Sequence, residues 1–271
     1  MNSSLYTIPP GIDDAVDEIC LVADTVEGYL HPNEKRFLAI VGAIPTTEGE
    51  ILEVGAFKGK STVILARAAR LSDGAMVHSV DPMTAPSITD PDLKGALSTL
   101  ADFRENVRKT GVEDAITLHQ MFSQELAPTW DRKLRLLWID GDHLYAGVRA
   151  DIEGFMPHLA DGAIVAFHDV LHRYDGGIRV FAENILLSPH FGAFGFSGSI
   201  GWAQFHADGD TAEFTKQKIK FYRRLARMIP YHVYPAKLSR FEKEKYNFYK
   251  FLVPHGRVDP NKWVKQLKTK R

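Results

Sequence analysis

The chain has 271 residues, of which 45% are hydrophobic and 25% charged, and it contains a single cysteine, Cys20. This length allows one large domain with an appended segment, and a lone cysteine excludes a disulfide framework and favours a reducing compartment. The sequence has no apolar run near the roughly 20 residues that span a bilayer, and its first residues lack the basic start and apolar core of a signal peptide, so we expect a cytoplasmic protein.

Charge is unevenly distributed along the chain, although the net charge is only −1. Residues 216–271 contain 17 Lys and Arg against 3 Asp and Glu, whereas the first 215 residues contain 16 basic and 31 acidic side chains. Two interpretations stay open for this basic, aromatic-rich segment. It packs against its own acidic body, or it contacts an anionic partner such as a membrane surface, an acidic glycolipid or a nucleic acid.

Apolar runs alternate with helical patterns along most of the chain. Residues 1–50 predict a helical lead-in, which could act as a lid, with a helix from Pro32 to Val41. After it, strands are predicted at 51–54, 76–80, 116–119, 134–139 and 163–167, with helices at 62–71, 92–110, 145–159 and 177–187. The glycine- and aromatic-rich residues 191–205 predict an antiparallel closing hairpin.

This order predicts an α/β fold with a doubly wound, Rossmann-like sheet of seven strands, mostly parallel and closed by the antiparallel hairpin. The run 136–139 is apolar without alternation, as expected for a strand covered on both faces. We divide the chain into the lead-in (1–50), a cofactor-binding domain (51–210) and a basic, aromatic C-terminal extension (211–271).

The segment from Glu53 to Thr62 resembles a phosphate-binding loop but is shorter by one residue. Three residues separate Gly55 from Gly59, whereas a P-loop has four between its glycines. Phe57 stands where a dinucleotide-binding fingerprint has its second glycine. The shortened turn suits an adenosine-containing ligand without phosphate, such as an adenine nucleoside that carries a sulfonium and an amino acid.

Polar residues follow each of the next four predicted strands as well. They are Asp81 after the second, Ser123 after the third, Asp140 and His143 after the fourth, and His168 and Asp169 after the fifth. Because the carboxyl ends of parallel strands form the ligand crevice of such sheets, we expect these side chains to meet. A carboxylate at Asp81 suits ribose hydroxyls, and the residues around Ser123 suit an adenine ring.

Together these motifs resemble those of the class I S-adenosylmethionine-dependent methyltransferases, over residues 40–205. The matching positions are Glu53–Thr62, Asp81, Trp138–His143 with Gly147, Val148 and Asp151, and Phe167–Asp169. The resemblance is to the branch that includes sugar and macrolide-sugar O-methyltransferases and cephalosporin-biosynthesis enzymes. The basic extension has no counterpart in it.

The resemblance implies S-adenosylmethionine as the cofactor and a hydroxyl of a sugar-like or glycosylated small molecule as the methyl acceptor. It implies cofactor contacts from Glu53, Gly55, Phe57, Gly59, Ser61, Asp81, Ser123 and Asp140. It also implies that His143, next to Asp140, is the general base, a role that suits a side chain whose pKa lies near neutrality.

Metal-dependent relatives bind magnesium at positions that correspond to Asp140, His168 and Asp169. His168 replaces a carboxylate there, and magnesium prefers oxygen ligands. The resemblance therefore leaves open whether magnesium, a softer divalent ion or no metal binds.

Other interpretations stay open. The extension could define a peripheral membrane-surface or anionic-partner-binding protein whose body only binds a cofactor, or the chain could be a non-methylating relative. The acidic body disfavours a nucleic-acid substrate, and a homo-oligomer is open. His172 and Asp175 are further candidates for substrate contact, and His31 is expected to help cap a helix.

Overall fold

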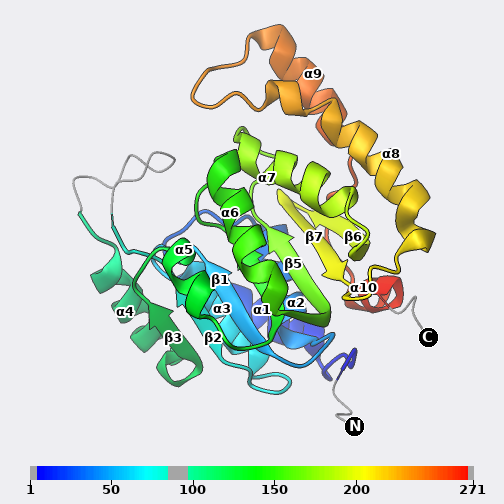
Figure 1. The fold of residues 1–271 in the computed structure, drawn as a ribbon. Coiled ribbons are helices and arrows are strands. Elements are labelled where there is room, and N and C mark those ends of the chain that lie inside the picture. Colours follow the sequence, from blue (N-terminus) through cyan, green and yellow to red (C-terminus); the bar gives the residue numbers. More distant parts are fainter. Residues whose placement is uncertain (1–4, 85–96, 268–271) are drawn as a thin grey trace.

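A computed structural model describes residues 5–84 and 97–267, in which a central sheet lies between two layers of helices (Figure 1). The strands are β1 (Glu50–Val54), β2 (Val77–Val80), β3 (Ile116–His119), β4 (Leu134–Ile139), β5 (Leu159–Phe167), β6 (Phe191–Ser197) and β7 (Ile200–Phe205). They lie in the order β3-β2-β1-β4-β5-β7-β6. The first five are parallel, and β7 is antiparallel to both β5 and β6. The predicted seven-stranded, doubly wound sheet with a closing hairpin is confirmed.

One face of the sheet is covered by helices from both ends of the chain. They are α1 (Ile12–Ala23), α2 (Pro32–Ala43), α3 (Lys60–Ala69), α4 (Leu100–Lys109) and α10 (Pro260–Leu267). Their buried side chains form one core cluster with Ile51, Leu136 and Trp138 of the strands. Every residue of α2 from Glu34 to Ala43 is buried, so the lead-in is an integral layer of this core.

The other face is covered by α5 (Ser123–Leu126), α6 (Tyr145–Phe155), α7 (Asp175–Val180), the π-helical turn Phe181–Leu186 and α8 (Thr215–Ala226). Successive strand residues point to opposite faces, and Leu52, Leu137 and Ile139 accordingly belong to this second cluster. In the C-terminal extension, α8 and α10 are anchored by buried apolar side chains, whereas α9 (Arg240–Phe251) has none.

Several predicted elements have different bounds in the structure, and three differences stand out. β5 begins at Leu159, four residues before the predicted strand. α4 begins at Leu100, and residues 92–96 of the predicted helix lie outside the described residues. α6 ends at Phe155 and is followed by a 3-10 turn that contains Pro157, because proline has no N–H to donate to the helix. Among the described residues, no helix combines the length and apolarity needed to cross a membrane.

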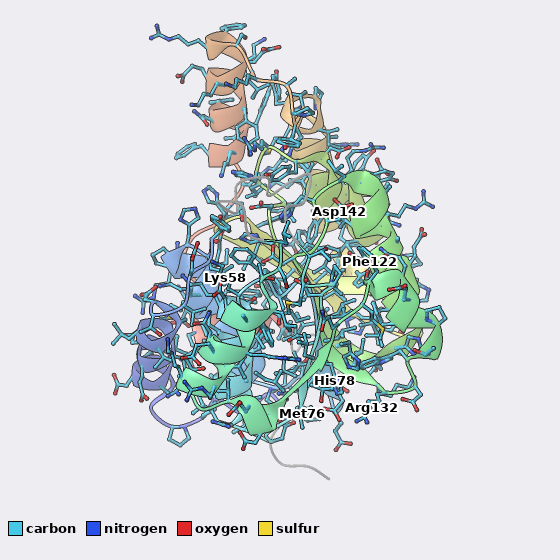
Figure 2. The ribbon with its side chains drawn as sticks, turned by 90° about the vertical axis from the view of Figure 1, so that its left-hand side faces the viewer. Lys58, Met76, His78, Phe122, Arg132 and Asp142 are labelled. Carbon is cyan, nitrogen blue, oxygen red and sulfur yellow. The ribbon has the colours of Figure 1, made fainter. Side chains whose placement is uncertain are left out.

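The topology creates a crevice between β1 and β4. The chain enters the sheet at β1, adds β2 and β3 on one side, and then crosses to β4 and β5 on the other. Ligands bind at such a reversal, at the carboxyl ends of the strands. In Figure 2, Phe122 and Asp142 lie toward this end of the sheet, whereas Met76 and Arg132, which precede β2 and β4, lie toward the opposite end.

Candidate active site

A cavity of about 1540 Å³ opens at the carboxyl ends of β1, β2, β4 and β5. Its wall includes Gly55, Asp81, Asp140 and His168, so the structure brings together residues that follow four different strands. Small-molecule sites typically have roughly 300–1,000 Å³. The cavity is therefore large enough for a cofactor and a second ligand beside it.

The glycine turn after β1 requires its first glycine. Gly55 has a φ of 85°, and a Cβ at this residue would lie 2.4 Å from the carbonyl oxygen of Asp140. Only glycine adopts this conformation readily and allows such an approach. The turn is held from β2, because Oδ2 of Asp81 accepts hydrogen bonds from the backbone N–H groups of Ala56 (2.8 Å) and Phe57 (2.9 Å).

Asp81 is therefore both part of the cavity wall and the organiser of the turn. Its Oδ1 accepts a third bond, from the N–H of Met83 at 2.6 Å. A carboxylate offers about four lone-pair positions, so roughly one is left for a ligand hydroxyl. The position suits the ribose role that the sequence predicts, with one direct hydrogen bond rather than two.

Glu53 lies beneath the turn, outside the residues that line the cavity. It is fully buried, and its carboxyl group accepts hydrogen bonds from Thr62 Oγ1 (2.5 Å) and Ser79 Oγ (2.7 Å). Burial raises its pKa to about 7, and the bonds from the hydroxyl groups offset this only in part. Gly59 also lies outside the cavity wall, whereas Gly55, Phe57, Ser61, Asp81, Ser123 and Asp140 line it.

The raised pKa of Glu53 predicts a pH-dependent stability. The unfolded chain loses this proton near pH 4.5, whereas the folded chain keeps it to about pH 7, so the free energy of unfolding falls between these values. One pKa unit corresponds to about 1.4 kcal/mol, which gives a loss of roughly 3 kcal/mol. Glu53→Gln should remove this loss and unfold at a higher temperature than the wild type at pH 8 but not at pH 4.

Thermal unfolding at a series of pH values measures this difference, with the exposed Glu48→Gln as the control. Equal pH profiles for wild type and Glu53→Gln would contradict it.

The part of the cavity wall that follows β3 combines an aromatic ring with a buried carboxyl group. Phe122, Ser123, Gln124 and Asp151 line it. Ser123 Oγ donates to Oδ1 of Asp151 at 2.5 Å, and burial raises the pKa of Asp151 to about 6. Asp151 was not among the predicted site residues. Its signal in the sequence is a charged residue on the apolar face of a helix, at helical spacing from Val148 and Phe155.

Two histidines converge on Asp169 at the end of β5. The Nδ1 of His143 lies 4.0 Å from Asp169 Oδ2, and the Nδ1 of His172 lies 3.5 Å from the same oxygen. The ring of His143 also stacks on Tyr174, with centroids 4.8 Å apart. Asp169 has a strained backbone, with a φ of 54°. Burial raises the pKa of Asp169, but the neighbouring histidines outweigh this and lower it, so the group is ionised.

The sequence pairs Asp140 with the predicted general base His143. In the structure Asp140 instead binds His168. Asp140 Oδ1 lies 2.9 Å from Nδ1 of His168, and Glu34 Oε2 lies 3.4 Å from its Nε2. Burial lowers the pKa of His168, but the charges of Asp140 and Asp169 raise it well above its ordinary value. His168 is therefore a buried cation between two carboxylates.

Glu34 anchors this cluster from α2. It is fully buried and accepts hydrogen bonds from the backbone N–H (2.7 Å) and hydroxyl group (2.8 Å) of Ser199 and from the N–H of His31 (2.8 Å). Burial raises its pKa, but the bonds and the charge of His168 outweigh this and lower it to about 2. The bond to His31 caps α2, so the cap predicted at His31 is made through its backbone.

The predicted metal ligands Asp140, His168 and Asp169 come together, but as ion pairs. Both ring nitrogens of His168 face carboxylates, Nδ1 that of Asp140 at 2.9 Å and Nε2 that of Glu34 at 3.4 Å. Within residues 5–84 and 97–267, no three His, Cys, Asp or Glu side chains are arranged to hold a metal ion. The donor set does not fit a divalent ion in this arrangement.

The cavity wall also contains residues that the sequence did not single out. Arg173, Lys250 and His255 line it, and the last two come from the C-terminal extension. Lys250 Nζ donates to the carbonyl oxygen of Leu171 at 2.9 Å. By contrast, Asp175 is absent from the wall and binds Arg179 and the N–H of Tyr145.

Comparison with known proteins identifies the domain. A family model described as a methyltransferase domain matches residues 52–170. An uncharacterized protein of Sinorhizobium fredii, y4gI, is 32% identical over 97 residues, which cover 34% of this chain and 11% of that protein. The chain thus spans about a tenth of the length of this curated relative.

Solved structures agree on the fold. The cofactor-bound Rv0187 from MTB has a TM-score of 0.52 at 17% identity and covers 73% of this chain and 98% of its own. A candidate O-methyltransferase from Klebsiella pneumoniae has a TM-score of 0.51 at 19% identity. The match covers 74% of this chain and 92% of that protein's chain. Residues 52–170 therefore match a methyltransferase domain, and the chain shares its fold with these solved structures.

Proposed function

We propose that the chain is an S-adenosylmethionine-dependent O-methyltransferase that acts on a hydroxyl group of a polar small molecule. The observation that carries this proposal is one cavity whose wall includes the glycine turn with Asp81 and also His143 beside an ionised Asp169. The match of residues 52–170 to a methyltransferase domain supports it.

The cofactor would lie against the glycine turn. In this position Gly55 and Phe57 face its amino acid part, Asp81 accepts a bond from its ribose, and Phe122, Ser123 and Asp151 surround its adenine. All of these residues line the cavity. The absence of a Cβ at Gly55 lets a ligand approach the backbone closely.

The proposed reaction is an in-line displacement at the methyl group of the sulfonium. The acceptor hydroxyl oxygen forms a bond to the methyl carbon, the carbon–sulfur bond breaks, and the electron pair stays on sulfur in S-adenosylhomocysteine. His143 takes the hydroxyl proton on Nε2, while Asp169 faces its Nδ1 and stabilises the resulting imidazolium. The cofactor supplies the reactive methyl group, and the protein supplies alignment and deprotonation. No step requires a metal.

We propose a sugar or glycosylated metabolite as the acceptor. The wall near His143 presents hydrogen-bonding groups from Asn33, His172 and Arg173 next to the ring of Tyr174, which suits a compact molecule with several hydroxyl groups. We place the reaction in the cytoplasm, consistent with a lone cysteine, with peripheral contact at an anionic membrane or glycolipid surface through the C-terminal extension.

Titration calorimetry with S-adenosylmethionine tests the cofactor. Asp81→Ala should weaken binding by roughly 10–150-fold, the cost of losing a charge-assisted hydrogen bond of about 1.5–3 kcal/mol. The exposed Asp131→Ala should bind like the wild type. No heat of binding in the wild type, or an unaltered affinity in Asp81→Ala, would refute the assignment.

Release of S-adenosylhomocysteine in the presence of a panel of sugars and glycosides tests the reaction. A protein that binds S-adenosylmethionine but releases no S-adenosylhomocysteine with any acceptor of the panel would favour a non-methylating relative.

A further inference from the structure

The C-terminal extension carries two exposed surfaces of different character. Figure 1 shows α8 along the side of the molecule and α9 farthest from the sheet, and Figure 2 also shows α9 projecting from the body. Neither surface belongs to the cavity described above, apart from Lys250 at the inner side of α9.

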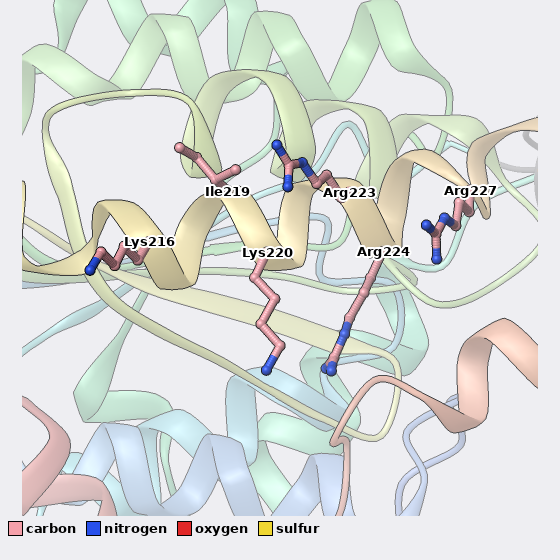
Figure 3. Close-up of a pocket in the computed structure, with 6 residues that line it drawn as sticks. All are labelled: Lys216, Ile219, Lys220, Arg223, Arg224 and Arg227. Atoms are coloured by element: carbon pink, nitrogen blue, oxygen red, sulfur yellow. The ribbon is translucent and has the colours of Figure 1, made fainter.

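The first surface is the basic face of α8, made of Lys216, Lys220, Arg223, Arg224 and Arg227 (Figure 3). These residues recur at spacings that keep them on the outside of one helix, and they line a shallow groove together with Ile219, which is 41% exposed. Across the described part of the chain, no Asp or Glu forms an ion pair with any of them. Their charges therefore face solvent without a counter-charge from the protein.

The second surface is the apolar face of α9, made of Phe241, Phe248, Phe251 and Leu252. These phenylalanines are 68%, 60% and 81% exposed. Helical spacing places Phe248 two turns after Phe241 and one turn before Leu252. The opposite side of the helix faces the body, where the Tyr246 hydroxyl donates to the carbonyl oxygen of Leu171 at 2.7 Å. The phenylalanines thus point away from the protein.

The two surfaces adjoin each other. Arg224 Nη1 of α8 donates to the carbonyl oxygen of Leu252, at the end of α9, at 2.9 Å. The Nζ of Lys245 lies 4.4 Å from the centre of the Phe241 ring, which mixes positive charge into the apolar face itself. Apolar side chains clustered on a surface commonly mark an interaction site.

We propose that these two surfaces together dock the protein on an anionic membrane. Phenylalanines on an interfacial helix insert at the level of the lipid headgroups, while neighbouring Lys and Arg side chains bind anionic headgroups. In an anionic bilayer the apolar acyl chains lie directly beneath the negatively charged headgroups, so the bilayer complements both surfaces at once. A nucleic acid complements the basic face alone, and a second copy of the chain would have to present an apolar and an acidic patch side by side. This inference does not require the methyl-transfer proposal.

Vesicle flotation tests the inference with the full chain. The protein should float with vesicles that contain phosphatidylserine and not with phosphatidylcholine alone, and high salt should weaken binding because it screens the charges. Each basic residue near an anionic surface contributes about fivefold in affinity. Lys220→Glu with Arg223→Glu should therefore weaken binding by roughly 25-fold or more.

Matched variants separate this surface from general effects. Phe248→Ser with Phe251→Ser should also lose flotation. Arg108→Glu with Lys109→Glu on α4 makes the same change of charge. Leu21→Ser with Leu187→Ser removes two other exposed apolar side chains. Both controls should float like the wild type. Calorimetry with S-adenosylmethionine on the same samples reports separately on the folded body and the cofactor site.

Three results would overturn the inference. The first is a wild-type protein that does not float with either vesicle. The second is a dimer, measured by light scattering without lipid, that the phenylalanine variant dissociates, since this would make the surface a self-interface. The third is a protein that binds a single-stranded oligonucleotide but does not float with vesicles.

Discussion

Replacing His143 with alanine is expected to lower the rate of methyl transfer by about 10²–10⁴-fold, the usual contribution of a positioned general base. A hydroxyl group is a poor nucleophile until its proton leaves, and His143 is the cavity residue that faces an ionised Asp169 while stacked on Tyr174. Affinity for S-adenosylmethionine should stay close to that of the wild type, because His143 makes none of the hydrogen bonds that hold the glycine turn, which come from Asp81. Release of S-adenosylhomocysteine gives the rate.

Two further histidine variants sharpen this experiment. His172→Ala tests the other histidine that faces Asp169, and we expect a smaller effect because its side chain is about half exposed. His158→Ala, outside the cavity wall, should be active. A large loss in His172→Ala with normal turnover in His143→Ala would move the base to His172.

Replacing Glu34 with alanine is expected to destabilise the fold by about 3–5 kcal/mol, the usual cost of removing one partner of a buried ion pair. The change leaves Nε2 of His168 and the N–H groups of Ser199 and His31 without their acceptor in a buried site, while Nδ1 of His168 keeps Asp140. Chemical denaturation at pH 7 measures the loss. The exposed Glu213→Ala should change stability by less than about 0.5 kcal/mol.

The pH dependence gives a second check on Glu34. Its pKa is lowered to about 2, so the stability it contributes is present above pH 4.5 and is lost as pH falls from 4.5 toward 2. Glu34→Ala should lack this part of the acid transition. An acid transition identical to that of the wild type would mean that His168 does not depend on Glu34.

The sequence predicted the central strands well because they are buried on both faces and give short apolar runs, as at 134–139, which matches β4 at both ends. The edge strand β3 also matches its predicted bounds, 116–119, although none of its residues is fully buried. Asp81 and His143 were predictable for a related reason, since residues directly after parallel strands share one edge of the sheet. Helix boundaries were less accurate, as at Leu100, because a helical pattern alone does not show where tertiary contacts begin.

The roles of His168 and of the extension depended on contacts that no local pattern encodes. His168 and Glu34 are 134 residues apart, and nothing in the sequence of α2 distinguishes a buried carboxylate from a solvated one. Lys250 is one of many basic residues in its segment, so its place in the cavity wall followed only from the docking of α9 against Leu171.

The sequence by itself determined the layered α/β fold, the glycine turn and the set of polar residues at the strand ends, because backbone periodicity and turn chemistry are local properties. Only the tertiary structure decided which of these residues meet. The charge state of His168, the partner of His143 and the outward face of α9 follow from the distances between side chains on different elements, and these distances are fixed by packing rather than by spacing along the chain.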